Sequence, residues 1–600
     1  MITSEQKKII KKEINDRNIS ELALKLNLGK EEILEYLKRT WKSARYEEFI
    51  RDSKQPFKPS NKTTLKQIFL NNIPFIILLF FIVCVIYVNT LNNSFVSDDI
   101  AGIANNPNIG KLSYVFQDFF YLTNKVIRFL IVNIFGIVPA YFRIVNILTH
   151  IGSALLIFLI LARLSNKRVA VFTSLIFAVH PILSESIAWI GGSDYSLYGF
   201  LFLLSFAFFI FRTDNKKYYL YSLISYLLML QTSEKTFHLF LIFILYVICY
   251  ESFKNNWKKL IPYVLLSFIW GIHYIYALFW RVGEVQTTYG AEKGYDNPLL
   301  QIPISLFAYL KLIFWPNNLT IYHSEFSIGM NEYYISAFVI LVCIVFTLYL
   351  FKKNKKLAFW LIFFVVTLLP FLTPFRISWL VAERYVYLGS IGIFVFVAVI
   401  LDWAFKKSRL KSQVVYSIFA ILILVLSVRT IIRNNDWQNE DSLWIATGKT
   451  SPSSSQNHNN LGDVYSRHGD LNKAVEEFSK ATQLKPNYAD AYHNLANTYQ
   501  KLGQVEKAIE NYNLAIKYNP NLWQSYQNLA QIYFEQKDYK KVLENLEKAY
   551  KIIPNNLNLL NNIGIVYMTV DNKEKAKETF EQVLSIDPVN QVAIDMLRVK

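Results

Sequence analysis

Hydrophobic and polar positions divide the chain into three zones. Nearly all of the long apolar runs lie between about residue 69 and residue 433, and the segments on either side are polar and rich in Lys, Glu and Asn. Runs of about 20 apolar residues have the length at which a helix crosses the hydrocarbon core of a bilayer. The pattern predicts a basic head, a helical membrane body and a soluble tail.

Eleven runs in the body are long enough to span a membrane. They lie at 70–91, 144–163, 169–189, 195–211, 218–232, 236–251, 260–279, 332–351, 357–374, 385–403 and 412–432. A twelfth run, 299–316, is interrupted by Gln301, Pro303, Tyr309 and Lys311. The sequence therefore predicts a polytopic bundle of about 11 transmembrane helices.

Basic residues beside the spans predict the orientation of the chain. If 299–316 does not cross the membrane, five clusters of Lys and Arg in the loops fall on the same side as the basic head, and the positive-inside rule assigns that side to the cytoplasm. These clusters are Arg163/Lys167/Arg168, Arg212/Lys216/Lys217, Lys254/Lys258/Lys259, Lys352/Lys353/Lys355/Lys356 and Lys406/Lys407/Arg409/Lys411. We therefore predict a cytoplasmic N-terminus, an external tail, and a surface-lying or re-entrant segment at 299–316.

The tail repeats with a fixed period. Five prolines, Pro452, Pro486, Pro520, Pro554 and Pro588, follow one another at intervals of 34 residues, which is the period of tetratricopeptide (TPR) helix pairs. Small and large apolar residues recur at matching positions in each interval, as in Gly462 and Phe478 or Gly564 and Phe580. Four repeats exceed the minimum of about three for a stable stack. The tail is predicted to be an α-solenoid.

The head contains a possible helical hairpin. Residues 18–38 have the pattern of two short amphipathic helices joined at 27–29, with Leu22, Leu26, Ile33 and Leu37 facing each other. The hairpin resembles a minimal helix-turn-helix, but a cytosolic hairpin without DNA contact has the same pattern. The predicted domains are a cytosolic helical hairpin (1–55), a linker (56–68), a transmembrane domain (69–450) and a TPR domain (451–600).

Charge and cysteine content exclude several classes of function. The formal net charge is +18, but the basic residues gather in the head and the loops, so nucleic acid is not the expected partner. Cys84, Cys249 and Cys343 all lie in apolar runs, so no disulfide framework is predicted for the tail. The first residues are charged, and the run near Leu70 is expected to stay as an anchor rather than to be cleaved. Sequence motifs for nucleotide hydrolysis, hydride transfer or zinc chemistry are not found.

Two acidic residues follow the first span. Asp98 and Asp99 lie in the segment 94–100, at the start of the first external loop. Adjacent carboxylates repel each other, and such a pair at a membrane surface can supply a general base. Acidic pairs are also common in solvated loops, so the residues alone leave both interpretations open.

Six segments in order resemble a known family. They are FVSDDIAGIANNP (95–107), RIVNILTHIGSALL (143–156), IFAVHPILSESIAWIGGSD (176–194), YLKLIFWPNNLTIYHS (309–324), LVAERYVYLGSIG (380–392) and RTIIRNNDWQNEDSLW (429–444). Together with the membrane body and the TPR tail, these segments resemble the transmembrane and TPR-containing protein O-mannosyltransferases and their prokaryotic relatives. The resemblance covers roughly residues 68–600.

This resemblance implies a function. The family belongs to the GT-C glycosyltransferases, which use polyprenyl-phosphate sugars at the external membrane face and take a carboxylate of the first loop as the base. That role falls on Asp98 or Asp99, and the family's Ala-Glu-Arg motif falls on 382–384. Arg384, with Glu383 beside it, is expected to bind the lipid phosphate, although an interfacial anchor has the same pattern. His180 and Glu185 are candidates for the same donor cavity, and helix packing is their alternative.

The chain also departs from the family pattern. An expected Arg is missing from 192–194, a Tyr-Arg-Pro element is replaced at 121–124, and a Ser-Lys-Glu element reads Ser-Glu-Lys at 233–235. The resemblance implies an inverting transfer of a sugar, with mannose as the candidate, to Ser or Thr of an acceptor polypeptide bound by the TPR array. The alternative is a non-catalytic, membrane-anchored TPR scaffold, with signalling through the head as a third possibility. No cofactor is specified, and the sequence leaves the need for a divalent metal open.

Overall fold

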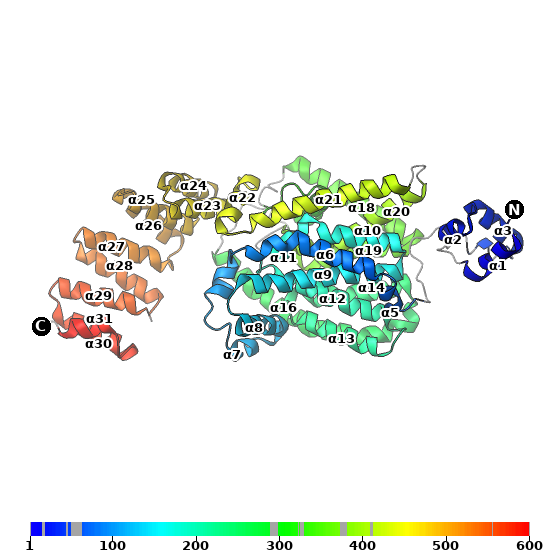
Figure 1. Ribbon diagram of the computed structural model, residues 1–600. Helices are drawn as coiled ribbons and strands as arrows, with labels where there is room; N and C mark the ends of the chain where they lie inside the picture. Colours follow the sequence, from blue (N-terminus) through cyan, green and yellow to red (C-terminus); the bar gives the residue numbers. More distant parts are fainter. Residues whose placement is uncertain are drawn as a thin grey trace. The chain divides into compact units, whose positions relative to one another are not determined.

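Helices make up all the regular structure that is described. The computed structural model describes residues 2–14, 19–41, 43, 46–47, 49, 63–288, 298–321, 323, 329–372, 381–407, 412–554 and 556–598 (Figure 1). Every regular element in these ranges is a helix, so the predicted all-α class is confirmed. The described chain forms two compact units. One runs from the head to Asn439, and the other is built mainly from Glu440 to the C-terminus.

Short helices make up the head. They are α1 (Ser4–Glu13), α2 (Ile19–Leu26) and α3 (Lys30–Thr40). Helix α2 ends where Asn27 takes a left-handed backbone conformation, with φ of 51°. The four apolar residues that the sequence pairs across this turn, together with Ile10 of α1, lie in one buried cluster. Within the described part of the head, three helices thus share one core, whereas the predicted hairpin has two.

Helices of very different lengths make up the membrane domain. They are α5 (Leu65–Leu70), α6 (Ile73–Tyr87), α7 (Leu112–Phe116), α8 (Leu122–Phe135), α9 (Pro139–Leu164), α10 (Lys167–Val179), α11 (Ser184–Ala188), α12 (Ser193–Phe211), α13 (Lys217–Leu230), α14 (Phe240–Tyr250), α15 (Phe253–Asn256), α16 (Ile261–Thr288), α17 (Pro298–Phe314), α18 (Met330–Lys353), α19 (Lys355–Leu368), α20 (Ser390–Lys407) and α21 (Ser412–Asp436). One-turn segments join them: η1 (Val88–Asn92), η2 (Ile100–Ala104), η3 (Phe119–Tyr121), η4 (Pro181–Leu183), η5 (Glu234–Leu239), η6 (Trp257–Leu260), η7 (Leu369–Phe371) and η8 (Glu383–Val386).

The predicted number of spans is not confirmed. By length and composition, six helical segments of the described chain can cross a membrane, or seven if the bent pair of α10 and 181–188 counts as one. The six lie at Ile73–Asn92, Pro139–Leu164, Ser193–Phe211, Phe253–Ala277, Met330–Lys353 and Gln413–Asp436. Helices α13 and α19 have 14 residues each. At about 1.5 Å per residue, such a helix is shorter than the hydrocarbon core of about 30 Å.

Exposed apolar side chains mark the lipid-facing helices. On α18, Phe338 is 67% exposed and Leu348 is 61% exposed, and α21 exposes Leu424 and Val425 in the same way. Soluble proteins rarely expose contiguous apolar surface on this scale. These helices therefore have the surface of an integral membrane protein.

A proline breaks the predicted span at 169–189. Helix α10 ends at Val179, His180 has an extended backbone, and Pro181 begins η4. Proline disfavours the helical conformation of the residue before it and removes a backbone donor. The axis bends by 55° at this point. The break turns α11 and the following loop, 189–192, toward the end of the bundle where the first loop lies.

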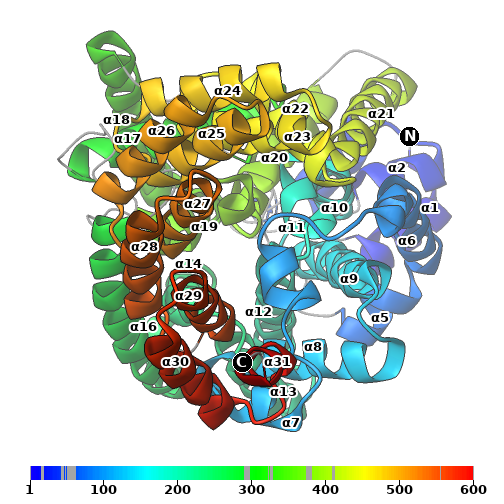
Figure 2. The same cartoon turned by 90° about the vertical axis from the view of Figure 1, so that its left-hand side faces the viewer.

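The tail consists of helix pairs, and the predicted TPR solenoid is confirmed. After α22 (Glu440–Thr450), the pairs are α23 (Ser455–Arg467) and α24 (Leu471–Leu484), α25 (Ala489–Lys501) and α26 (Val505–Tyr518), α27 (Trp523–Glu535) and α28 (Tyr539–Ile552), and α29 (Leu557–Thr569) and α30 (Lys573–Ile586), followed by α31 (Gln591–Arg598). Figure 2 shows them in a curved succession. Helix α22 belongs to the same unit.

One backbone position recurs in every repeat. The turn between the two helices of each pair contains a residue with positive φ: Gly469 (79°), Gly503 (72°), Lys537 (62°) and Asp571 (57°). These residues are 34 positions apart, like the prolines. The turn is therefore built in the same way four times, although only two of the four residues are glycine.

Candidate functional site

The two acidic residues of the first loop lie in different environments. Asp98 is exposed, whereas Asp99 is 1% exposed. Burial raises the pKa of Asp99 to about 6, against the lowering effect of the Val96 and Gly191 peptide N–H groups and of the Arg143 guanidinium. Asp99 Oδ2 accepts the Val96 N–H at 3.5 Å, and Oδ1 has no hydrogen-bond partner among the described residues. Asp99 thus presents a buried carboxylate with one oxygen available.

A buried arginine fixes the start of this loop. Arg143, on α9, is fully buried and donates from Nε to the Ala188 carbonyl at 2.8 Å. Its two Nη atoms donate to the carbonyl oxygens of Asn93 and Ser94. The guanidinium therefore ties the chain that leads into Asp99 to the end of α11. The sequence predicts no role for Arg143, since its partners are backbone atoms about 45–50 positions away in the chain.

Arg384 and Glu185 form a second charged group. Glu185 belongs to α11, the helix whose end Arg143 contacts. Glu185 is fully buried on α11; its Oε2 accepts the Arg384 backbone N–H at 2.9 Å, and its Oε1 binds Nη1 of the guanidinium. The Arg384 side chain is 11% exposed and lies over the rings of Trp189, at 5.3 Å, and Tyr385, at 5.0 Å. The two predicted donor-site residues thus contact each other directly.

Glu383 pairs with Arg433, for which the sequence predicts no role. Arg433 Nη2 lies 3.0 Å from Glu383 Oε1, and its Nη1 lies 2.9 Å from Asp436. The side chains of Arg433 and Glu383 are at most 1% exposed. The only signal in the sequence is the position of Arg433 inside the landmark at 429–444, because no periodicity links residues 50 positions apart.

One short segment connects the acidic loop with Arg384. Residues 185–191 carry Glu185 and Trp189, which contact Arg384, and Gly191, whose N–H acts on Asp99. A Cβ added at Gly191 would lie 2.7 Å from the Trp189 ring, so glycine is required for this close turn. Asp99 and Arg384 therefore face one wall of the bundle, although 285 positions separate them in the sequence.

A further polar cluster adjoins this wall, and its residues were not predicted as a site. Asn124 hydrogen-bonds to Asp194, and Arg128 Nη2 lies 3.6 Å from the same carboxylate. The cluster lies where the chain departs from the family pattern, at 121–124, 192–194 and 233–235. Across the cluster, Tyr121 binds Glu234, and Lys235 Nζ lies 3.2 Å from the Tyr195 hydroxyl. These residues bring 121–128, 194–195 and 234–235 together.

His180 lies apart from these contacts. Its Nε2 is 2.9 Å from the Ile313 carbonyl, and its Nδ1 accepts the Ile182 N–H at 3.3 Å. The ring packs 4.9 Å from Phe394. Nδ1 thus serves the break between α10 and η4, and Nε2 joins the break to α17; the predicted role of His180 in donor binding stays a prediction.

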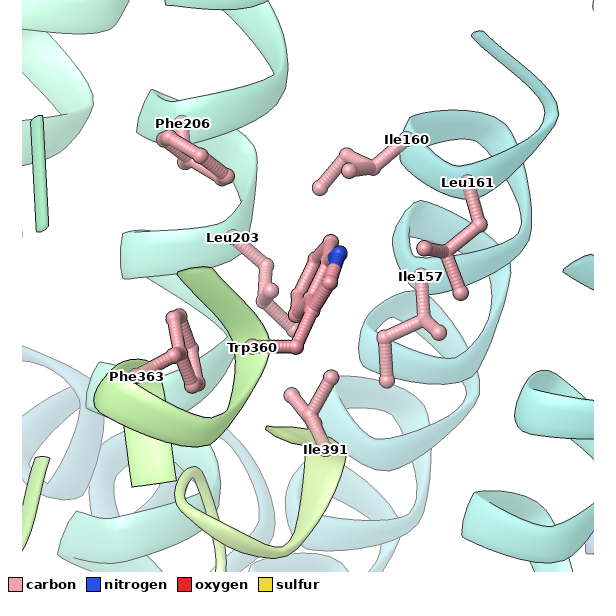
Figure 3. A pocket seen from close by; sticks show the side chains of 8 residues that line it. All are labelled: Ile157, Ile160, Leu161, Leu203, Phe206, Trp360, Phe363 and Ile391. Atoms are coloured by element: carbon pink, nitrogen blue, oxygen red, sulfur yellow. The ribbon is translucent and has the colours of Figure 1, made fainter. Parts of the chain in front are cut away.

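An apolar cavity lies between α9, α12, α19 and α20. Figure 3 shows the side chains that line it, all of them apolar apart from the indole nitrogen of Trp360: Ile157, Ile160, Leu161, Leu203, Phe206, Trp360, Phe363 and Ile391. The cavity contains no acid or base. It is therefore separate from the chemistry of the acidic loop.

Comparisons with known proteins find similarity to a mannosyltransferase domain and to tetratricopeptide repeats. Residues 125–280 match the model of dolichyl-phosphate-mannose-protein mannosyltransferases, and 462–503, 488–555 and 557–590 match tetratricopeptide repeat models. Protein O-mannosyl-transferase Tmtc2 of Drosophila melanogaster is 30% identical over 125 residues, which are 20% of this chain and 13% of that protein. A protein O-mannosyl-transferase of Caenorhabditis elegans is 25% identical over 434 residues, which are 67% of this chain and 61% of that protein.

The crystal structure of MamA, at 24% identity and a TM-score of 0.23, covers 24% of this chain and 85% of MamA. The matched segments span less than two thirds of both mannosyl-transferases, 13% of the first and 61% of the second. The chain thus combines a mannosyltransferase-type domain in a membrane bundle with tetratricopeptide repeats, and in this combination it is similar to the TPR-containing protein O-mannosyl-transferases.

Proposed function

We propose that the protein is a glycosyltransferase that moves a sugar, with mannose as the candidate, from a polyprenyl-phosphate carrier to a Ser or Thr hydroxyl of a polypeptide. The observation that carries this proposal is the single wall, 185–191, that contacts both Asp99 and Arg384. A base and a cation beside one reacting centre are what inverting transfer from a lipid phosphate requires.

Asp99 is the better candidate for the base. With a pKa of about 6, its carboxylate is ionised at neutral pH and is still basic enough to accept a proton as the hydroxyl oxygen attacks. The hydroxyl oxygen forms a bond to the anomeric carbon, while the bond from that carbon to the phosphate oxygen breaks. The phosphate oxygen leaves with the electron pair, and the proton stays on Asp99. Asp98, by contrast, is exposed to solvent.

Arg384 is the candidate for stabilising the leaving phosphate. Glu185 holds the guanidinium through Nη1 and the backbone N–H, and within the described residues Nε and Nη2 make no hydrogen bond. Two donors in a fixed fork match two phosphate oxygens. The aromatic rings of Trp189 and Tyr385 keep the guanidinium in place. The ion pair with Glu185 thus orients the guanidinium and leaves its Nε–Nη2 edge for the phosphate.

The decisive experiment is transfer in vitro. Purified full-length protein in detergent is incubated with polyprenyl-phosphate mannose and a Ser/Thr-rich peptide, and glycosylated peptide is measured by mass spectrometry. We expect product with the wild type and none with Asp99→Asn. Absence of product from the wild type with mannose, glucose and N-acetylglucosamine donors would favour the non-catalytic scaffold instead.

We also propose that the reaction takes place at the external membrane face, with the head in the cytoplasm. The five basic clusters in the loops support this orientation. In right-side-out vesicles, a tag on the C-terminus should be cleaved by added protease while a tag on the N-terminus is protected. Protection of both tags would contradict the orientation but leave the chemistry untouched.

A further inference from the structure

The last turns of α21 contact both halves of the candidate site. Arg433 connects to the Arg384 side through its 3.0 Å contact with Glu383, the residue before Arg384. Both side chains are at most 1% exposed. A buried ion pair of this kind is costly to break, because either partner alone leaves an uncompensated charge in a medium of low dielectric constant. The pair therefore fixes the backbone at 383–384.

Trp437, one turn further along, contacts the shared wall. Its fully buried ring stacks on the Trp189 ring with centroids 5.6 Å apart and an interplanar angle of 15°. Trp189 also contacts the Arg384 guanidinium, at 5.3 Å. The Arg433 guanidinium in turn lies 5.5 Å from the Trp437 ring. Two aromatic rings and two guanidinium groups thus form one packed group.

One backbone hydrogen bond and two side-chain hydrogen bonds connect the same turns to the segment that leads into the acidic loop. The Ser94 N–H donates to the Gln438 carbonyl at 2.8 Å, and the Asn93 side chain donates to the Asn434 carbonyl at 3.3 Å. Asn434 donates back to the Ile86 carbonyl at 2.9 Å, at the end of α6. The chain reaches Asp98 only four residues after Ser94. The end of α21 therefore contacts the entry to the acidic loop as well.

We propose that Arg433 and Trp437 are positioning residues, and that the end of α21 sets the placement of Arg384 relative to Asp99. Neither residue touches the reacting atoms; each acts through a neighbour, Glu383 for Arg433 and Trp189 for Trp437. The proposal rests on the proposed function for its catalytic consequence, but the positioning itself can be measured without activity. A displacement of about 1 Å in such a site is enough to cost about a hundredfold in rate.

The first test measures backbone exchange. Full-length wild type, Arg433→Met and Trp437→Ala are compared by hydrogen–deuterium exchange in detergent. The control is Arg168→Met, which removes an ion pair of 2.8 Å between an arginine that is 32% exposed and Asp402, which is 2% exposed. We expect faster exchange at 381–389 and 93–100 in Arg433→Met and Trp437→Ala and not in the control. Wild-type exchange at both segments would overturn the proposal.

A second variant keeps the test decisive if Arg433→Met loosens the whole membrane domain. Arg433→Lys preserves the charge but not the fork that reaches both Glu383 and Asp436. We expect faster exchange at 381–389 alone, with the rest of the domain as in the wild type. Unchanged exchange at 381–389 in this folded variant would also overturn the proposal.

Kinetics separates positioning from a general loss of structure. We expect Arg433→Lys to raise the KM for the lipid donor about tenfold, the scale of one lost charge-assisted hydrogen bond, and to leave the KM for the peptide unchanged. Equal losses for both substrates would contradict a positioning role. If the wild type transfers no sugar, the proposed function fails, whereas the exchange measurement still decides whether Arg433 and Trp437 position the wall.

Discussion

Asp98 and Asp99 are neighbours in the chain, yet one side chain faces solvent and the other is 1% exposed. The difference arises at Ser97, whose left-handed backbone, with φ of 54°, turns the loop so that Asp99 packs inward. The two adjacent carboxylates therefore do not share one environment, and only Asp99 has the buried position of the proposed base.

Replacement of each aspartate should separate the two roles. We expect Asp99→Asn to lower kcat at least about a hundredfold, because it removes the general base. Asp98→Asn should change kcat less than about fivefold, since a solvated carboxylate contributes little to a buried site. The measurement is the initial rate at saturating donor. Similar mild losses in both variants would mean that the pair is only a solvated turn.

The pH dependence follows from the raised pKa of Asp99. The active form is the ionised carboxylate, so kcat/KM should fall tenfold per pH unit below about pH 6 and be level above it. The free energy of unfolding changes with pH in the opposite direction. A carboxyl with a raised pKa in the folded state binds its proton more tightly there than in the unfolded state. Its ionisation therefore destabilises the fold as the pH rises from about 4 to 6. An unfolding curve for Asp99→Asn should lack this loss.

Arg384 and Glu185 should respond differently to conservative change. Arg384→Lys keeps the charge but loses the planar fork, so we expect a donor KM raised about tenfold with measurable turnover remaining. Arg384→Met should abolish turnover. Glu185→Gln leaves Arg384 without its buried counter-charge and should cost stability as well, by about 3 kcal/mol. Thermal unfolding of the three variants in detergent, measured beside the kinetics, distinguishes lost binding from lost fold.

Gly192 offers a test of the wall without a change in charge. An added Cβ at this residue would lie 2.6 Å from the Glu185 carbonyl oxygen, which is backbone and has no room to yield. We expect Gly192→Ala to displace the segment 185–192 and to lower kcat/KM at least about tenfold. Gly329→Ala is the matched control, because a Cβ there meets nothing within 4 Å. Wild-type kinetics for Gly192→Ala would show that the wall is not rigid.

The sequence predicts the tail better than the membrane body for a physical reason. Each TPR contacts only its neighbours, so a local period of 34 residues is enough to define helix pairs. In the body, helices such as α13 and α19 stop short of a full span, and Pro181 breaks another, so the length of an apolar run overstates the helix it forms.

The site could be predicted only in part. Glu185, Glu383, Arg384 and the acidic pair are found through the resemblance, which preserves them within short motifs. Their partners Arg143 and Arg433 lie in the landmarks 143–156 and 429–444, but the resemblance assigns them no role, and contacts between segments 45–50 residues apart follow no helical or repeat period. His180 has the residue type of a site histidine, but its nitrogens bond to Ile313 and Ile182 at the helix break.

The recurring left-handed turn makes the TPR array uneven in strength. A residue other than glycine in this conformation costs roughly 1 kcal/mol, and the cost falls on Lys537 and Asp571, in the third and fourth repeats, and not on Gly469 and Gly503. Because repeat arrays unfold in segments rather than all at once, the C-terminal half should open first on heating. Lys537→Gly and Asp571→Gly should close this gap and bring the four repeats to a single melting transition.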